Sequence, residues 1–495
     1  MNILTTTATS LQTLTRDVET QLRWIDGVEI RLDLLERGHV AEVVAGVRAM
    51  LPETGKIICT VRRRQDGGGY DGSESERFKV LRAAIEAAPD YVDLEYDLAS
   101  DDFGPLAARA DEHGVTIIWS LHDLTGVPED LAATLDSMVQ SEGGVAKVAV
   151  TPQSTADLLR LVEAADGSEA SPRIVIGMGP YGTLTRVAPA RFGSLLTFGS
   201  VPGAQAAPGH LSPQELFEVY RVGDQRGGWP LFAVVGNPVA HSRSPHYHNA
   251  RFVEGKASAL YAPLLVDEFS ALMALADRLP LHGLSVTIPH KESALSISDE
   301  QSPEAKAIGA ANTLVRVRDG WHATNTDVLG FLAPLEEVQG QLGGLTALVL
   351  GAGGAARGVV YALARSGVNA LVWNRTRARA TELCAQLAAL PDADALSLPR
   401  ALSDPAELED AGPVELVVNT TSLGMHGEGD PAPWYSFHGT ELVYDIVYTP
   451  PETPLVKRAA AAGCRVITGD RMFAAQAAAQ FELFFAIATG FQDGD

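Results

Sequence analysis

The segment LTALVLGAGGAARGVVYALARSG, residues 345–367, has the pattern of a buried strand, a glycine turn and a helix. A mostly apolar run precedes the glycines, and apolar residues then recur at spacings of three and four. Gly351, Gly353 and Gly354, followed by Ala355, let backbone amides at a helix N-terminus approach a pyrophosphate. A tight strand–helix turn without a ligand is the alternative. The segment therefore predicts a Rossmann-type nucleotide-binding domain.

The next predicted strand ends about 20 residues further on, at the sequence Asn374, Arg375, Thr376, with Arg379 close behind. A site for NAD would favour Asp or Glu here, to bind the ribose 2′-hydroxyl. A guanidinium beside a neutral residue suits the 2′-phosphate of NADP(H) instead. The alternative is a solvated basic start of a helix.

Working outward, we predict three α/β regions. Residues 335–471 form the nucleotide-binding domain, and residues 231–334 form a second α/β domain that begins at FAVVGNP. An apolar helix at residues 472–490 packs back across the domain interface. Residues 1–222 hold eight short apolar runs, most of them followed by a helical pattern, which predicts a (β/α)8 barrel. VGDQRGGWP links the barrel to the rest.

Composition limits the classes of partner. The 495 residues contain 46% hydrophobic and 20% charged residues and carry a net charge of −24, so nucleic acid and membranes are poor partners. Cys59, Cys384 and Cys464 show no spacing of a disulfide framework or metal site. No stretch approaches the about 20 apolar residues of a spanning helix, and MNILTTTATS does not read as a signal peptide. We expect a cytoplasmic protein without a metal.

Polar residues collect where the predicted barrel strands end, which is where barrel enzymes carry their chemistry. Lys147 lies in the apolar run GVAKVAV, where burial favours the neutral, nucleophilic amine. His122, on the neighbouring strand, is a candidate general base. The alternative for Lys147 is a side chain that reaches solvent from a strand end or pairs with Glu29. Several arginines nearby indicate an anionic substrate with a carboxylate.

The segments VEIRLD, CTVR, IIWSLHD, GVAKVAV, GTLTR and AAPGHLS resemble type I 3-dehydroquinate dehydratase, in the same order. The resemblance implies that Lys147 forms an imine with the C3 ketone of 3-dehydroquinate. His122 then takes the C2 proton and assists loss of the C1 hydroxyl. The implied substrate-binding residues are Glu29, Arg31, Arg62, Arg186 and His210.

One segment departs from this family. Its lid usually reads Ser-Ala-Pro-Gly-Gln, whereas this chain has Ala206, Ala207, Pro208, Gly209 and His210. The serine hydroxyl is lost and an imidazole replaces the glutamine amide, so we expect weaker binding or a different closure of the lid.

Two motifs in the second half carry chemistry of their own. Ser242 and Ser244 follow a strand and are spaced to bind one carboxylate, although an ordinary turn is the alternative. Lys291, in LSVTIPHKE, and Asp327, in ATNTDVLG, can form a pair in which the ammonium donates a proton to a ketone oxygen. A surface ion pair is the alternative.

The motifs GNPVAHSRSP, GLSVTIPHKE, GAANTL, NTDVLGF, GAGGAAR, NRT, NTTSLGM and GDRMFAAQAAAQFE closely resemble shikimate dehydrogenase. The resemblance implies Lys291 and Asp327 as the catalytic pair. It also implies the substrate-binding residues Ser242, Ser244, Thr287, Asn312 and Gln476, and places Met425 and Gly469 with the cofactor. Ser285 stands where the family often has Asn.

The two halves thus resemble consecutive enzymes of the shikimate pathway. Dehydration of 3-dehydroquinate would give 3-dehydroshikimate, and NADPH would reduce that product to shikimate. One alternative is a regulatory protein that binds these metabolites without turning them over. Another is a quinate/shikimate dehydrogenase that prefers NAD. The sequence leaves the oligomeric state open.

Overall fold

The computed structural model describes residues 1–36, 40–97, 100–140, 144–204, 209–318, 320–425 and 427–490, and it leaves out the side chains of residues 100–103 and 140. Two compact units follow one another along the chain, Met1–His282 and Gly283–Gly490. The boundary falls inside the predicted domain 231–334, and the predicted domain limits stay a prediction.

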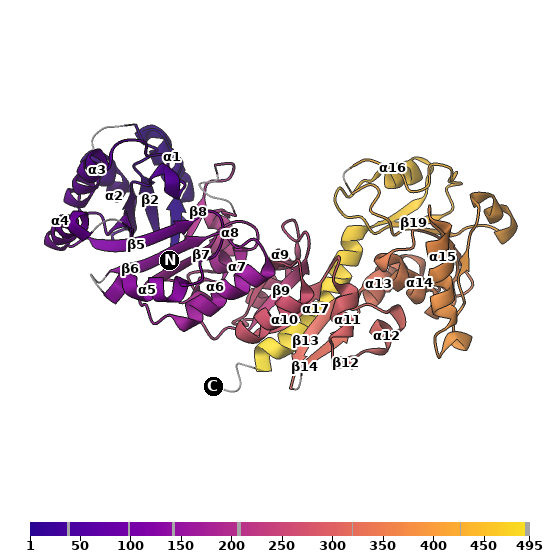
Figure 1. Cartoon of the computed structure of the whole chain (residues 1–495). Coiled ribbons are helices and arrows are strands. Elements are labelled where there is room, and N and C mark those ends of the chain that lie inside the picture. The colour runs from indigo at the N-terminus through magenta and orange to yellow at the C-terminus, as the bar shows by residue number, and fades with distance from the viewer. Residues whose placement is uncertain are drawn as a thin grey trace. The chain divides into compact units, whose positions relative to one another are not determined.

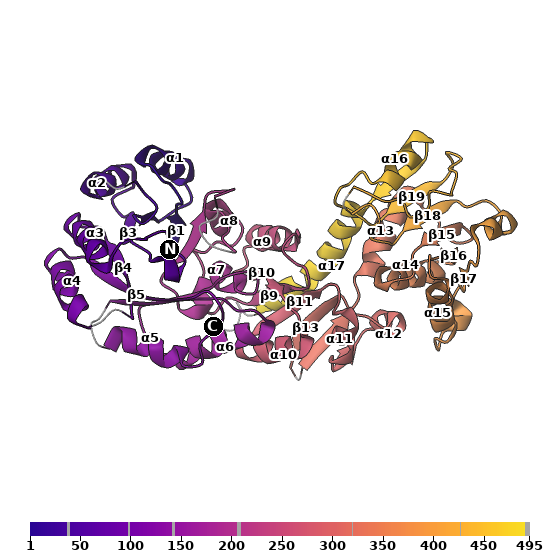
Figure 2. The ribbon, with the colours of Figure 1, turned by 45° about the horizontal axis from the view of Figure 1, so that its top comes forward.

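Eight parallel strands form the first sheet, in the order β7-β6-β5-β4-β3-β2-β1-β8. The strands are β1 (Asn2–Thr5), β2 (Gly27–Arg31), β3 (Lys56–Thr60), β4 (Tyr91–Glu95), β5 (Thr116–Asp123), β6 (Val145–Val150), β7 (Arg173–Gly177) and β8 (Thr197–Ser200). The helices are α1 (Leu11–Gln21), α2 (Val40–Met50), α3 (Glu74–Glu86), α4 (Ser100–Glu112), α5 (Leu131–Gln140), α6 (Thr155–Gly167), α7 (Thr183–Val187) and α8 (Pro213–Glu218). Figure 2 shows these helices surrounding the strands. The (β/α)8 prediction is confirmed.

The barrel closes between β7 and β8 through residues that precede β8. Arg173 and Ser194 form an isolated parallel bridge. The Ser194 hydroxyl oxygen accepts a hydrogen bond from the Val175 amide at 2.9 Å, and the Leu195 amide donates to the Arg173 carbonyl at 2.8 Å. A side chain therefore replaces part of the ladder at this seam.

Residues 231–282 belong to the same compact unit as the barrel. They contain β9 (Leu231–Gly236), α9 (Ser244–Glu254), β10 (Leu260–Leu265) and α10 (Phe269–Arg278), with β9 and β10 paired in parallel. Helix α10 packs on α6 of the barrel. Asp267 accepts hydrogen bonds from the Thr155 amide and hydroxyl at 2.9 and 2.5 Å. These contacts fix residues 231–282 to the barrel.

The second unit begins within β11 (Leu281–Val286). It continues with α11 (Lys291–Ser296), β12 (Glu300–Gln301), α12 (Pro303–Ile308), β13 (Thr313–Val317), β14 (Gly320–Thr324) and α13 (Asp327–Gln339). Strand β13 runs antiparallel to both β11 and β14. Because β11 and β14 both pair with β13, the turns that lead from β11 into α11 and from β14 into α13 belong to the same sheet.

A six-stranded parallel sheet of order β17-β16-β15-β18-β19-β20 follows. Its elements are β15 (Thr346–Leu350), α14 (Gly354–Arg365), β16 (Asn369–Trp373), α15 (Arg377–Ala388), β17 (Arg400–Ala401), β18 (Leu416–Asn419), β19 (Leu442–Asp445), α16 (Pro454–Ala461) and β20 (Arg465–Thr468). The order reverses direction beside β15, and ligands of open α/β sheets bind at such a point. The Rossmann-type prediction is confirmed.

The last helix, α17 (Gly469–Gly490), packs along α13 and contacts β13 and β20 (Figure 1). A Cβ at Gly330 would lie 2.6 Å from the Gln476 Cβ, so only glycine allows this close approach of the two helices. Among the described residues α17 is the one helix long and apolar enough to cross a bilayer by length and composition, which corrects our expectation that no stretch is.

Candidate active sites

Lys147 lies on β6 with its side chain inside the barrel, 4% exposed. Its Nζ donates to Asp93 Oδ2 at 2.8 Å and lies 4.0 Å from Glu29 Oε1. The ammonium also lies 4.5 Å from the centroid of the Phe198 ring. The expected apolar environment is therefore wrong, because β4 and β2 contribute the carboxylates of Asp93 and Glu29 to the barrel interior.

Asp93 and Glu95 on β4 were not among the predicted site residues, although both are buried. Arg62 Nη2 lies 2.7 Å from Asp93 Oδ1, and Arg62 Nη1 lies 3.1 Å from Glu95 Oε1. The Ser120 hydroxyl donates to Asp93 Oδ1 at 2.6 Å. Burial opposes ionisation, yet Arg62 and Lys147 hold the pKa of Asp93 well below its usual range. Asp93 thus remains a carboxylate that holds Lys147 in place.

Glu29 and Arg31 lie two residues apart on β2 and differ in their partners. Glu29 accepts hydrogen bonds from the hydroxyls of Thr5 and Thr60, both at 2.8 Å. Arg31 forms a bidentate ion pair with Asp33, with Nε and Nη2 donating at 2.9 and 2.6 Å. Glu29 therefore faces Lys147, and Arg31 is held by a carboxylate of its own loop.

Arg186 and His210 are buried and His122 is partly buried. All three retain buried polar atoms without a hydrogen-bond partner, namely Nδ1 of each histidine and Nε and Nη1 of Arg186. Burial, helped by the cations Arg62 and Lys147, lowers the pKa of His122 well below its usual value. Burial lowers the pKa of Arg186 to about 10, so the guanidinium remains charged at neutral pH. Residues 205–208 of the lid lie outside the described residues.

The barrel interior thus holds a lysine amine, a neutral imidazole and a buried guanidinium with free donors. A neutral imidazole can accept a proton, and a desolvated guanidinium attracts a carboxylate. This set of groups can bind a small carboxylic acid and perform amine chemistry on its carbonyl.

In the second unit, Lys291 at the start of α11 and Asp327 at the start of α13 form an ion pair of 2.6 Å between Nζ and Oδ2. Asn312 Nδ2 donates to Asp327 Oδ1 at 2.8 Å and to the Thr326 hydroxyl at 3.0 Å. The Asp327 amide donates to Asn325 Oδ1 at 3.0 Å. Both oxygens of the Asp327 carboxylate are therefore held, and the pair remains about one-fifth exposed to an incoming substrate.

Gln480 was missed by the sequence reasoning. Its Oε1 accepts from the Ser285 hydroxyl at 2.8 Å, while its Nε2 donates to the Thr313 hydroxyl at 2.8 Å. Gln476, one helical turn earlier on α17, makes only a 3.3 Å bond to the Phe473 carbonyl, so its amide has capacity left for a ligand. Thr287 follows β11 and is half-buried.

Ser242 and Ser244 belong to the first unit, whereas Lys291 and Asp327 belong to the second. The Ser242 hydroxyl accepts from the Ser244 amide at 3.3 Å at the start of α9. Ser244 is buried and Ser242 is partly exposed. Ser242 therefore forms the ordinary turn that the sequence also allows, and joint binding of a carboxylate by the two hydroxyls stays a prediction.

The glycine turn between β15 and α14 fits a dinucleotide. Gly351 has a φ of +112°, and a Cβ there would lie 2.6 Å from the Thr420 hydroxyl. A Cβ at Gly353 or Gly354 would enter open space, so this side of the turn is clear for a phosphate. Ala355 follows in the first turn of α14. The turn therefore offers free backbone amides at a helix N-terminus.

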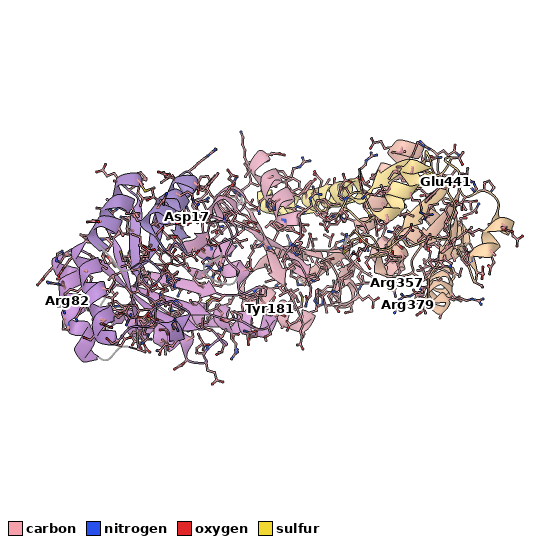
Figure 3. All side chains as sticks on the ribbon, turned by 90° about the horizontal axis from the view of Figure 1, so that it is seen from above. Asp17, Arg82, Tyr181, Arg357, Arg379 and Glu441 are labelled. Carbon is pink, nitrogen blue, oxygen red and sulfur yellow. The ribbon has the colours of Figure 1, made fainter. Side chains whose placement is uncertain are left out.

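The turn after β16 presents the predicted basic group. Asn374 Nδ2 donates to the Thr376 carbonyl at 2.8 Å and closes the turn into α15. Arg375, Arg377 and Arg379 are exposed, and Figure 3 labels Arg379 on α15. The residues at this strand end include no carboxylate that would favour NAD.

Met425 and Gly469 differ in exposure. Met425 lies in the loop between β18 and β19 and is 47% exposed, so the alternative of a core methionine is wrong. Asn419 supports that loop, because its Nδ2 donates to the Leu423 carbonyl at 3.3 Å and to Asp445 at 2.9 Å. Gly469 is buried, and a Cβ there would lie 2.3 Å from the Ile446 carbonyl oxygen.

No group of three or more metal-ligating side chains occurs in the part of the chain that the structure describes.

The family models that match this chain follow the same order as the motifs. One described as type I 3-dehydroquinase matches residues 3–226, one described as shikimate dehydrogenase substrate binding domain matches residues 234–314, and one described as shikimate/quinate 5-dehydrogenase matches residues 335–402. Together they span both halves of the chain.

Among curated relatives, the bifunctional 3-dehydroquinate dehydratase/shikimate dehydrogenase, chloroplastic, of Arabidopsis thaliana is 32% identical over 483 residues, covering 93% of this chain and 77% of the relative. The shikimate dehydrogenase (NADP(+)) of Moorella thermoacetica is 42% identical over 261 residues, covering 51% of this chain and 87% of the relative. Among solved structures, the dehydroquinate dehydratase and shikimate dehydrogenase from S. pombe is 24% identical, covers 99% of this chain and 98% of that one, and has a TM-score of 0.43.

Proposed function

Because the chain belongs to the family of bifunctional 3-dehydroquinate dehydratase/shikimate dehydrogenases, we propose that its two sites catalyse consecutive steps with the residues described above. The barrel dehydrates 3-dehydroquinate to 3-dehydroshikimate, and the second half reduces that product to shikimate with NADPH. The observation that carries this assignment is that both a buried lysine–carboxylate cluster and a separate Lys291–Asp327 pair are intact in one chain.

In the barrel, Lys147 attacks the C3 ketone of 3-dehydroquinate, and loss of water leaves an imine at Nζ. Asp93 and Glu29 stabilise the cationic imine that follows. His122, which burial keeps neutral, takes the C2 proton and returns it to the departing C1 hydroxyl, so that water leaves. Hydrolysis of the imine then releases 3-dehydroshikimate and restores the amine.

The substrate carboxylate binds Arg186, whose Nε and Nη1 have no protein partner. Arg62 holds Asp93 and reaches the substrate from the same side, while Arg31 and His210 border the site. Binding an anion to Arg186 compensates the cost of keeping its charge out of water.

In the second unit, Thr287, Asn312 and Gln476 bind hydroxyls of 3-dehydroshikimate. Ser242 and Ser244, by their spacing, are suited to a carboxylate. NADPH, when bound, supplies the hydride that reduces the ketone. Lys291 holds a proton at Nζ beside the ketone oxygen and donates it as negative charge develops there. Asp327 fixes the ammonium, and Asn312 in turn orients Asp327.

The glycine turn at Gly351, Gly353 and Gly354, with Ala355, would hold the pyrophosphate of NADPH. Arg375 and Arg379 would bind the 2′-phosphate, with Asn374 and Thr376 forming the turn beside them. Met425 and Gly469 would contact the nicotinamide. The arginines favour NADPH over the alternative of an NAD-preferring quinate/shikimate dehydrogenase.

One assay tests the assignment. The full chain receives 3-dehydroquinate and NADPH, and ultraviolet absorbance of the enone is followed together with oxidation of NADPH. Both signals are expected, with the enone forming before NADPH is consumed. If the chain binds both metabolites but converts neither, the regulatory alternative is correct instead.

The location is proposed as cytoplasmic, because the cysteines Cys59, Cys384 and Cys464 are free thiols that suit a reducing compartment. The strong negative charge remains the argument against nucleic acid and membranes as partners.

Arg375→Ala is expected to raise KM for NADPH much more than KM for NADH. A charge-assisted contact to the 2′-phosphate contributes about 1.5–3 kcal/mol, or roughly 10- to 150-fold in discrimination. Steady-state kinetics with both cofactors measure the effect. Lys457→Ala, which removes an exposed cation of α16, is the control. Equal effects on the two cofactors would place Arg375 outside the phosphate site.

His210→Gln is expected to make the barrel less sensitive to acid. Burial, with Arg186 and Lys147, lowers the pKa of His210 to about 2 in the folded chain. Below pH 6.5 the unfolded chain therefore binds a proton that the folded chain does not, and stability falls by about 1.4 kcal/mol per pH unit. Between pH 7.5 and pH 5 the variant should lose about 2 kcal/mol less than the wild type.

Urea unfolding at both pH values, with hydrogen exchange of β5 and β6 peptides as the local signal, measures this difference. His113→Gln changes an exposed histidine of the same barrel and should keep the wild-type pH dependence. The same pH dependence in His210→Gln and the wild type would show that His210 is not held neutral.

A further inference from the structure

Arg77 is a fully buried arginine that lies outside every motif described above. It belongs to α3, whose N-terminus is capped by Ser73 and Glu76. The side chain is 0% exposed. Its Nη1 donates to Glu95 Oε2 at 2.6 Å and to the Val61 carbonyl at 3.1 Å. A buried guanidinium on an outer helix therefore reaches a carboxylate of the barrel interior.

A continuous series of ion pairs joins Arg77 to Lys147. Arg77 Nη1 lies 2.6 Å from Glu95 Oε2, and Glu95 Oε1 lies 3.1 Å from Arg62 Nη1. Arg62 Nη2 lies 2.7 Å from Asp93 Oδ1, and Asp93 Oδ2 lies 2.8 Å from Lys147 Nζ. Each carboxylate uses one oxygen for each neighbour, so the position of every member depends on the next.

The series is balanced in charge only if Arg77 is included. Lys147, Arg62 and Arg77 face the carboxylates of Asp93, Glu95 and Glu29, and all of these side chains are at most 6% exposed. Glu74 also contacts Arg77, but it is 47% exposed and can be hydrated. Without Arg77, Glu95 would be a buried carboxylate in direct contact with Arg62, while Arg63 would act on it only through space.

We propose that Arg77 is a positioning residue of the dehydratase: by sharing Glu95 with Arg62, it keeps Arg62 placed so that Nη2 holds Asp93 against Lys147. The proposal rests on the proposed dehydratase function of the barrel. Arg77 touches neither Lys147 nor the region of His122 and Arg186, so it acts through Glu95 and Arg62.

The physical consequence of losing Arg77 is a net negative charge beside the imine-forming amine. The groups that face Arg77 are Glu74 on its own helix, Glu95 on β4, the Val61 carbonyl after β3 and the Phe78 ring. Those that face Lys147 are Asp93, Glu29 and the Phe198 ring, with His122, Arg62, Arg186 and His210 close by. An added negative charge in this enclosure favours the ammonium over the nucleophilic amine.

Arg77→Met keeps much of the side-chain volume and removes the charge. Its dehydratase kcat should fall by about 10-fold with a smaller change in KM, since Arg77 does not touch the substrate. The acid limb of the dehydratase pH profile should move upward by about 0.5–1 pH unit. The dehydrogenase activity of the same sample should be unchanged, which shows that the chain is folded and active elsewhere.

Three further variants separate positioning from packing. Glu74→Gln removes the outer carboxylate of Arg77 and should keep the wild-type profile, because Glu95 keeps its partner. Arg77→Lys retains the charge and should return the acid limb toward the wild-type pH. Arg77→Met combined with Glu95→Gln removes one charge of each sign and should also shift the limb back, even if kcat stays low.

If Arg77→Met does not give a folded barrel, kcat and the acid limb of the pH profile are measured on Arg77→Lys and on the double variant instead. A wild-type chain without dehydratase activity would contradict the proposed function itself. The inference would be overturned if the wild type is active and Arg77→Met has the same kcat and pH profile. A lower melting temperature of Arg77→Met alone would show only that Arg77 packs α3 onto the barrel.

Discussion

Lys147→Ala is expected to reduce dehydration of 3-dehydroquinate by about 10³–10⁶-fold, as loss of a covalent nucleophile does elsewhere. Among the described residues Lys147 is the one lysine that pairs with Asp93 and Glu29, so no second described amine is placed to form the imine there. The variant should still reduce 3-dehydroshikimate at the wild-type rate, because Lys291 and Asp327 belong to the other compact unit. Absorbance of the enone and oxidation of NADPH measure the two activities in one sample.

The covalent intermediate gives a second, independent result. Borohydride added during turnover should reduce the imine to a stable secondary amine on Lys147. Trypsin no longer cleaves after an alkylated lysine, so the adduct should appear on the peptide of residues 110–160. Mass spectrometry of the wild type should show this peptide with the added mass of the reduced adduct. Lys147→Ala also leaves residues 110–160 uncleaved, so its peptide should appear without the added mass.

Two further variants distinguish loss of imine formation from loss of stability. Removal of Lys147 leaves Asp93 and Glu29 with less compensation and destabilises the barrel, by about 3–5 kcal/mol for a buried pair. Lys147→Arg keeps the charge but cannot form an imine, so it should be folded and inactive as a dehydratase. Lys79→Ala removes an exposed lysine of α3 and should behave as the wild type. Dehydration that survives in Lys147→Arg would mean that the barrel uses another mechanism.

The sequence predicts the strands of the barrel well but not the surroundings of Lys147. Each strand is a short run of apolar residues, and this local pattern is enough to place it. The neighbours of Lys147 along the chain, Ala146 and Val148, point to the opposite face of the strand. Asp93 and Glu29 come from β4 and β2, which are distant in sequence. An apolar environment inferred from flanking residues was therefore wrong.

Some of the missed residues had a signal in the sequence. Asp93 and Glu95 lie two apart in the apolar run YVDLEY, so both must face the same side of β4. Gln480 lies four residues after Gln476 in an apolar helix and shares its face. In each case a polar residue inside an apolar element indicates a buried hydrogen-bond network.

Other features depend on contacts that no local pattern contains. Arg31 matches a substrate-binding position, but its guanidinium is held by Asp33 in a bidentate pair. The Asn374 amide closes its own turn through the Thr376 carbonyl. The identity of a residue shows which functional group lies at a position. Its hydrogen-bond and ion-pair partners in the fold determine whether that group is still available to a ligand.

Lys291→Ala is expected to lower kcat of the dehydrogenase by about 10²–10⁴-fold, the usual contribution of a positioned proton donor. Hydride delivery to the ketone puts negative charge on its oxygen, and the ammonium stabilises that charge mainly in the transition state. KM should therefore change much less than kcat. The dehydratase should be unaffected, so 3-dehydroshikimate should accumulate when 3-dehydroquinate is supplied. Lys306→Ala, an exposed lysine of α12, is the control.

The partner of Lys291 gives the sharper test. Asp327→Asn keeps the shape and can still bond to Asn312, but it removes the charge that lies 2.6 Å from Lys291 Nζ. Its kcat should fall, and the double variant should lose little more than Lys291→Ala alone, because residues that act as one unit are not additive. Additive losses would mean that the two side chains act separately. An increase of KM alone in Lys291→Ala would make Lys291 a binding residue, and the proton would then have to come from another group.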